Sequence, residues 1–224
     1  MKSLILYSTV VGGFYAQTDH LAAAVATARS RIGEDTWKRG FSGGEPGGAT
    51  EAAHRELREA GIEPVHVEGE LVHVGFVENR DNAGNTYPKL RVGLQCMDEE
   101  MLLSLDLKGD VAQRLLVKID NCQPGDYIRI SAWPTVVARG DRSFINHAVS
   151  VKDAEGKEIP VNSDFAAQVK KLTDGIEATL IATGITDKKV VATAKATRRI
   201  DAHKELLLQV QERFVQARAN ACSV

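Results

Sequence analysis

The chain has 224 residues, of which 43% are hydrophobic, and its 28 Lys and Arg against 30 Asp and Glu give a formal net charge of -2 at pH 7. This composition is that of a globular protein with a sizeable core, and it excludes a disordered chain. The near balance of charge excludes a protein that wraps duplex DNA through overall basicity, so an anionic ligand has to be held by locally placed cations.

The cysteines and the opening segment indicate where the protein works. Three cysteines lie far apart, with no CxxC pair and no histidine at zinc-ligand spacing: Cys96, Cys122 and Cys222. This pattern indicates neither a disulfide framework nor a structural zinc. The opening MKSLILYSTVVGGFYAQ is typical of a buried strand rather than a signal peptide, and no apolar run reaches the roughly 18 to 20 residues that span a bilayer. We therefore expect a cytoplasmic protein with no membrane contact and with neither a metal nor a cofactor.

The first region, residues 1–64, is predicted to be rich in helix and to contain one strand, at residues 4–10. An alanine-rich helix follows, with Asp19 as its N-cap and Gly33 as its stop. After a glycine-rich loop, a further helix is expected over residues 50–60.

The middle region, residues 65–162, changes to alternating periodicity. Two strands joined by an Asn/Asp/Gly turn are expected within residues 70–95, which is a hairpin pattern. A third strand, a short helix and two more strands are expected at residues 100–107, 109–122, 123–133 and 144–153. Three strands, a helix and two strands is the order of the OB-fold, a small Greek-key barrel. The predicted fold class is therefore mainly β, a five-stranded OB-fold barrel with helical N- and C-terminal additions.

The last region, residues 163–224, is predicted to be helical. Its long final helix has Leu206, Val210 and Phe214 at four-residue steps, and such a stripe packs either on the barrel or on a second subunit. A basic run precedes the stripe, and it either extends a path for an anionic ligand or is an ordinary solvated face. Its cations are Lys188, Lys189, Lys195, Arg198 and Arg199.

Two predicted strands present an aromatic and basic face. Alternate residues of a strand point to opposite sides, so YPKLRVGL and DYIRISAW each turn apolar residues one way and aromatic or cationic residues the other. The loop after the second strand adds two arginines and a phenylalanine. Because unpaired bases stack on aromatic rings and cations pair with phosphates, this pattern favours single-stranded nucleic acid. The alternative is a solvated face of ordinary strand-forming residues. The candidate binding residues are Tyr87, Lys89, Arg91, Tyr127, Arg129, Trp133, Arg139, Arg142 and Phe144.

The segments GELVHVGFVENRDNAGNTYPKLRVGLQ, EMLLSLDLKGDVAQRLLVKI, QPGDYIRISAW and FINHAVSVKDAEGKEIPV resemble the OB-fold single-stranded DNA-binding proteins of phages and related mobile elements. The resemblance covers about residues 65–162 and rests on element order. It implies a non-enzymatic protein that coats exposed DNA independently of sequence during replication or recombination, in the cytoplasm of a bacterial host. It also implies replication or recombination proteins as partners, and a homo-oligomer, for which the C-terminal helix is the candidate contact. The chain departs from the family in its ending RFVQARANACSV, which lacks an acidic tail, and in its N-terminal 60 residues, which have no counterpart.

The segment GGEPGGATEAAHRELREAGI, residues 43–62, resembles a Nudix box, in which a glycine loop and a helix carry glutamates that hold Mg²⁺ against a diphosphate. Glu56 and Glu59 match the box, but two of its carboxylates are missing and its spacing is one residue short. The structural alternative is a surface helix capped by Thr50 and stopped by Gly61. No other catalytic set stands out, so we assign no catalytic residue. Two alternatives to DNA binding stay open: a degenerate Nudix-type, Mg²⁺-dependent nucleoside diphosphate hydrolase, and a protein-interaction OB module.

Overall fold

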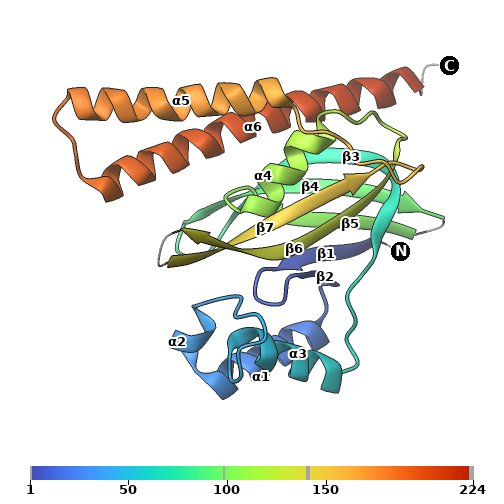
Figure 1. Cartoon of the computed structure of the whole chain (residues 1–224). Coiled ribbons are helices and arrows are strands. Elements are labelled where there is room, and N and C mark those ends of the chain that lie inside the picture. Colours follow the sequence, from blue (N-terminus) through green and yellow to red (C-terminus); the bar gives the residue numbers. More distant parts are fainter. Residues whose placement is uncertain (1, 98, 140–141, 222–224) are drawn as a thin grey trace.

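The computed structural model of the protein describes residues 2–97, 99–139 and 142–221, which form one seven-stranded sheet and six helices (Figure 1). Within those residues, no helix is both long enough and apolar enough to cross a membrane. The elements in chain order are β1 (Lys2–Ser8), β2 (Gly13–Ala16), α1 (Asp19–Ile32), α2 (Glu34–Trp37), α3 (Ala49–Glu59), β3 (Val67–Arg80), β4 (Thr86–Cys96), β5 (Glu99–Asp106), α4 (Asp110–Ile119), β6 (Tyr127–Arg139), β7 (Arg142–Lys152), α5 (Ser163–Ala182) and α6 (Lys188–Ala221).

The sheet is mixed and has the strand order β2-β1-β5-β4-β3-β6-β7. Neighbouring strands are antiparallel except β1 and β5, which are parallel. The five strands expected in the middle region are present as β3 to β7, with α4 between the third and the fourth. The sheet nevertheless has seven strands and not five, because β1 adds to the free edge of β5 and β2 adds to β1. Residues 1–64 therefore contribute two strands, one more than predicted, to the same sheet as residues 65–162.

The sheet curls around α4 and keeps its apolar face inward (Figure 1). Along β4, the alternate residues Leu90, Val92 and Leu94 are fully buried, as the period of two requires. The helix α4 contributes Leu115 and Ile119 to the same core, and both are fully buried. The opposite face of the sheet is the outer face, and the residues between the buried ones point to it.

Side chains join β1 and β2 to β6 and β7 across the open side of the curled sheet, which we call the seam. The Tyr7 hydroxyl and His147 Nδ1 are 2.8 Å apart and hydrogen-bonded, and the two rings meet edge to face. Burial raises the pKa of Tyr7 to about 12 and lowers the pKa of His147, so the pair is neutral at pH 7. Nearby, Gly12 has a φ of 83°, and a β-carbon there would overlap the ring of Pro134. These contacts link the two edges of the curled sheet through side chains, since β2 and β7 are its edge strands and no backbone pairing closes it among the described residues.

Helices α1, α2 and α3 form a second apolar cluster beneath the β1–β2 edge of the sheet (Figure 1). The buried residues Ala28, Ala53 and Leu57 pack there against β1–β2 residues. The predicted N-cap Asp19 is wrong by one position, because the Thr18 hydroxyl accepts the hydrogen bond from the Leu21 amide and Asp19 begins the helix.

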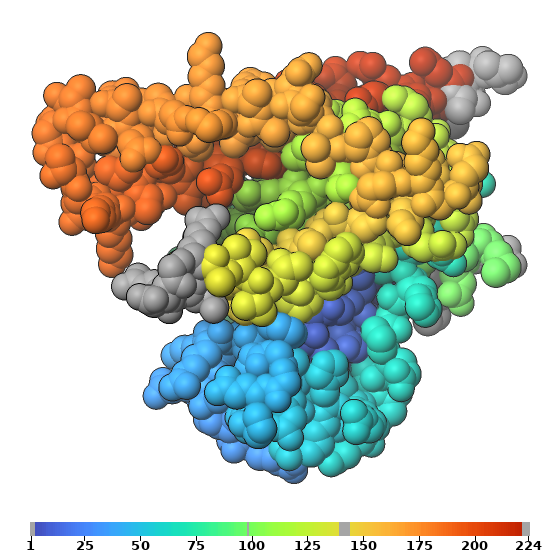
Figure 2. Space-filling model, viewed as in Figure 1, coloured from blue at the N-terminus to red at the C-terminus, as the bar shows by residue number. Residues whose placement is uncertain are grey.

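Helices α5 and α6 form an antiparallel hairpin, which we call the arm, that lies over α4 and β3 and projects beyond the end of the sheet (Figures 1 and 2). Leu206, Val210 and Phe214 are buried in the main core, which confirms that this stripe packs on the sheet. Gln211 Oε1 accepts a hydrogen bond of 2.7 Å from the Phe76 amide, so α6 also covers part of β3. The core thus extends across residue 162 into the C-terminal helices.

Candidate nucleic-acid interface

The predicted binding residues of β4 lie on the outer face, but acidic side chains contact two of them. The Tyr87 hydroxyl donates a 2.9 Å hydrogen bond to Asp81, which raises the pKa of the tyrosine. Lys89 Nζ lies 3.6 Å from an oxygen of Asp106. The Nε atom of Arg91 is buried and has no hydrogen-bond partner among the described residues. In this row of predicted residues on β4, Arg91 is therefore a cation with unused hydrogen-bonding capacity.

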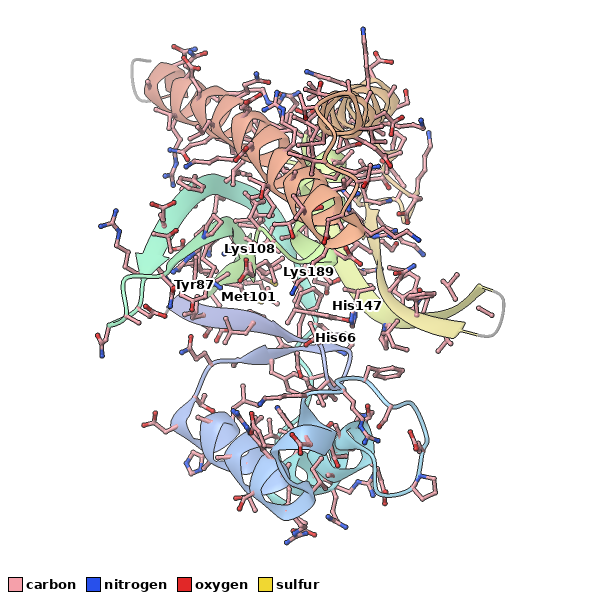
Figure 3. The ribbon with its side chains drawn as sticks, turned by 90° about the vertical axis from the view of Figure 1, so that its left-hand side faces the viewer. His66, Tyr87, Met101, Lys108, His147 and Lys189 are labelled. Carbon is pink, nitrogen blue, oxygen red and sulfur yellow. The ribbon has the colours of Figure 1, made fainter. Side chains whose placement is uncertain are left out.

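A lysine outside the predicted set stands beside the Tyr87 ring. Lys108 Nζ lies 5.5 Å from the ring centroid, within the range of a cation–π contact, and it also donates to the Thr86 carbonyl. Figure 3 shows Tyr87 and Lys108 toward the left of the sheet and His147 toward its right. The sequence did not single out Lys108, because it follows β5 and reaches Tyr87 only through the β4–β5 pairing.

The predicted binding residues of β6 share the outer face with those of β4. Arg129 Nε donates to Glu68 at 2.6 Å, and this ion pair raises the pKa of the arginine. Tyr127 is partly buried, whereas the Trp133 side chain is 44% exposed. Of this row, the tryptophan offers the largest accessible ring.

The structure does not join the two rows into one continuous site. Both β4 and β6 pair with β3, but Arg91 lies opposite Gly75 whereas Tyr127 lies opposite Glu70. From there the rows run in opposite directions along β3, because Tyr87 lies opposite Asn79 whereas Arg129 lies opposite Glu68. Glu68 and Glu70 of β3 stand beside the start of the β6 row, and their charge opposes a phosphate there.

Beyond its pairing with β3, the β6–β7 hairpin continues as a two-stranded ribbon, described over residues 133–139 and 142–147. Trp133 and Phe144 lie on one side of it, 44% and 47% exposed. The pair on the other side, Val136 and Ile145, is 63% and 38% exposed. Exposed apolar side chains gathered in this way mark an interaction surface. The side chains of the predicted Arg139 and Arg142, at the end of the ribbon, lie outside the described residues.

Three cavities follow one another from the arm to the seam. The first, about 630 Å³, lies along the arm and is lined by Lys188, Lys195 and Arg199, which share one face of α6. The second, about 360 Å³, lies between α4, α5, α6 and β7, and shares Arg199 with the first. The third, about 260 Å³, lies at the seam and shares Asp110 with the second. Three cations of the basic run therefore line the first cavity, and one of them, Lys195, is paired with Glu177.

The segment that resembles a Nudix box belongs to the N-terminal cluster. Glu56 is buried on α3, and its Oε1 lies 2.6 Å from Arg31 Nη1. Thr50 does not cap the helix, since its hydroxyl donates to the Val10 carbonyl and accepts from the Ser42 amide. In the part of the chain that the structure describes, no three His, Cys, Asp or Glu side chains are grouped so that they could hold a metal ion. The contacts of Glu56 and Thr50 are those of a packed helix.

Comparison with known proteins adds no assignment to this geometry. No protein-family model matches the chain, and neither the curated proteins nor the solved structures contain a match.

Proposed function

We propose that this protein binds single-stranded DNA independently of sequence, with the β6–β7 ribbon as the principal contact. The observation that carries the proposal is the pair of exposed rings, Trp133 and Phe144, on one side of a projecting ribbon. They lie four residue steps apart along the ribbon, about 13 Å, so they can receive different bases. Bases stack on such rings whatever their identity, which accounts for binding without sequence preference.

The arrangement of strands supports the same proposal. The strands β5-β4-β3-β6-β7, with α4 between β5 and β6 in sequence, have the connectivity expected of an OB-fold whose barrel is open between its third and fifth strands. In this view β1 and β2 occupy the open seam. The OB-fold is a frequent scaffold for binding single strands of nucleic acid.

Cations near the ribbon supply the contacts to phosphate. Arg139 is the last residue of β6 and Arg142 the first of β7, and the arm adds the row along α6 that contains Lys188 and Arg199. Phosphate contacts of this kind are not sequence-specific, which suits a protein that coats DNA during replication or recombination of a phage or mobile element. An oligomer formed through α6 would have to use its exposed residues, such as Leu208 and Val215, because the stripe through Val210 is buried within the chain.

Fluorescence anisotropy with labelled oligo-dT over a series of salt concentrations tests the proposal. We expect saturable binding at low salt that weakens steeply as salt rises, because counterions are released from the strand. A duplex of the same length should bind more weakly, since its bases are not free to stack. No binding of oligo-dT at low salt contradicts the proposal, and the exposed ribbon then favours a protein partner. Mg²⁺-dependent release of phosphate from nucleoside diphosphate derivatives, lost in Glu56→Gln, would instead support the hydrolase.

A further inference from the structure

The cavity between α4, α5, α6 and β7, which we call the junction cavity, combines an apolar wall with polar groups from several elements. At about 360 Å³ it falls within the size range of sites for small ligands. Its apolar wall comes from Val117, Val149, Phe165 and Val169. Such a wall suits a flat or aliphatic part of a ligand, whereas the polar groups decide which ligand fits.

His203 supplies a hydrogen-bond acceptor to the cavity. Its side chain lines the cavity and is more than nine-tenths buried, with a Phe165 ring packed edge to face at 5.1 Å. His203 Nδ1 lies 2.7 Å from the Arg199 carbonyl oxygen, which can only accept, so Nδ1 carries the proton. Burial lowers the pKa of His203, so the ring is neutral at pH 7 and Nε2 keeps its lone pair. The hydrogen bond of this ring to the Arg199 carbonyl uses Nδ1, so Nε2 is the ring atom that can accept from a ligand N–H.

Two arginines supply positive charge to the same cavity. Arg114 comes from α4 and Arg199 from α6, and neither forms an ion pair within the described chain. Lys118 also lines the cavity but is paired with Glu158. One carboxylate, Asp110, stands one helical turn before Arg114, so the two guanidinium groups outnumber it. A planar guanidinium is well suited to the oxygens of a phosphate.

We propose that the junction cavity holds one nucleotide unit, with its phosphate against Arg114 and Arg199, its base against the wall around Phe165, and a base N–H donated to His203 Nε2. The inference rests on the proposed function, since the nucleotide belongs to the bound strand, and a free nucleotide offers the same chemistry. The position of the cavity between the arm and the sheet places this unit beside the cations of α6.

The chain offers a matched pair of variants for the test. Arg199→Gln removes a cation that lines the cavity, whereas Arg198→Gln removes its neighbour, which contacts Glu205 and lines none of the cavities described above. Both variants change the net charge equally, so a difference between them reports the cavity and not the overall field. Binding of thymidine 5′-monophosphate is measured by calorimetry, and binding of oligo-dT by anisotropy, on the full chain. Thermal melting checks that each variant is folded.

We expect saturable binding of thymidine 5′-monophosphate that weakens about tenfold or more in Arg199→Gln and in Arg114→Gln, and by less than about twofold in Arg198→Gln. The imidazole resonances of His203 should shift on adding the nucleotide. If oligo-dT binds but the mononucleotide does not, or if Arg198→Gln weakens it as much as Arg199→Gln, the cavity proposal fails and the proposed function stands. If the mononucleotide binds with this pattern but oligo-dT does not, the cavity proposal stands and the proposed function fails.

Discussion

Removing the two rings of the ribbon should weaken DNA binding strongly while leaving the fold intact. Trp133 is 44% exposed and Phe144 is 47% exposed, so each offers about half of its surface to a base. Stacking on an aromatic side chain contributes roughly 1–3 kcal/mol per base, and a half-covered ring belongs in the lower part of that range. We therefore expect Trp133→Ala and Phe144→Ala each to weaken oligo-dT binding by about 1–2 kcal/mol, a factor of about 5 to 30.

The double variant separates stacking from a general loss of surface. Because the two rings lie about 13 Å apart along the ribbon, their effects should add, to about 2–4 kcal/mol in all. Met97→Ala serves as the control, since Met97 is 90% exposed in the turn after β4 and lies outside the ribbon. Anisotropy titrations at fixed salt give the affinities, and thermal melting reports the fold. If the double variant melts like the unmodified protein and binds oligo-dT within about twofold of it, the stacking argument is refuted.

Four further predictions concern the framework of the site. Tyr7→Phe should lower the free energy of unfolding by about 1 kcal/mol in a denaturant titration, because His147 Nδ1 loses its partner at the seam; an unchanged midpoint would contradict this role. In the same titration, Gly12→Ala should lower the free energy of unfolding by about 2 kcal/mol or more, because alanine resists a φ of 83° and its β-carbon meets the Pro134 ring. Gly84→Ala should lower it less, since Gly84 has a similar φ of 82° but open space around it. Burial lowers the folded-state pKa of His147 and His203, so the unfolded chain takes up protons first: stability should be full above about pH 6.5 and fall as the pH drops below it. His203→Gln should reduce that fall in melting temperature, and an identical pH profile would show that His203 does not cause it. Glu56→Gln should lower the free energy of unfolding by about 1–2 kcal/mol, because the contact with Arg31 is lost. Mg²⁺ should not change the melting temperature of the unmodified protein or of this variant, and a melting temperature that shifts with Mg²⁺ would favour the hydrolase.

Local sequence patterns predicted the elements of the fold well where one periodicity dominates. The alternation that buries Leu90, Val92 and Leu94 and the four-residue stripe through Val210 are both present in the structure. The cap of α1 was misplaced by one residue because Thr18 and Asp19 are both good capping residues and only the backbone distinguishes them. The parallel pairing of β1 with β5 had no local signal, since it joins segments about 100 residues apart.

The candidate site was harder to predict, because its chemistry depends on contacts between distant residues. Alternation correctly placed Arg129 on the outer face, but it could not show that Glu68, 61 residues earlier, neutralises the arginine. The divergence of the two rows follows from the registers of β4 and β6 on β3, which no local pattern in the sequence specifies. Arg114 and His203 were missed for the same reason, since α4 and α6 meet only in the folded chain. The sequence did indicate part of the arm's cavity, because seven- and four-residue steps place Lys188, Lys195 and Arg199 on one face of a helix.

The intrinsic fluorescence of Trp133 tests the central claim most directly. The chain has two tryptophans, so Trp37→Phe leaves Trp133, on the ribbon, as the single tryptophan reporter. We expect oligo-dT to quench this fluorescence saturably, with the same midpoint as the anisotropy titration, because a base stacks on the ring. Binding seen by anisotropy with unchanged Trp133 emission would contradict the ribbon as the contact surface, and no change in either signal at low salt would contradict single-stranded DNA binding itself.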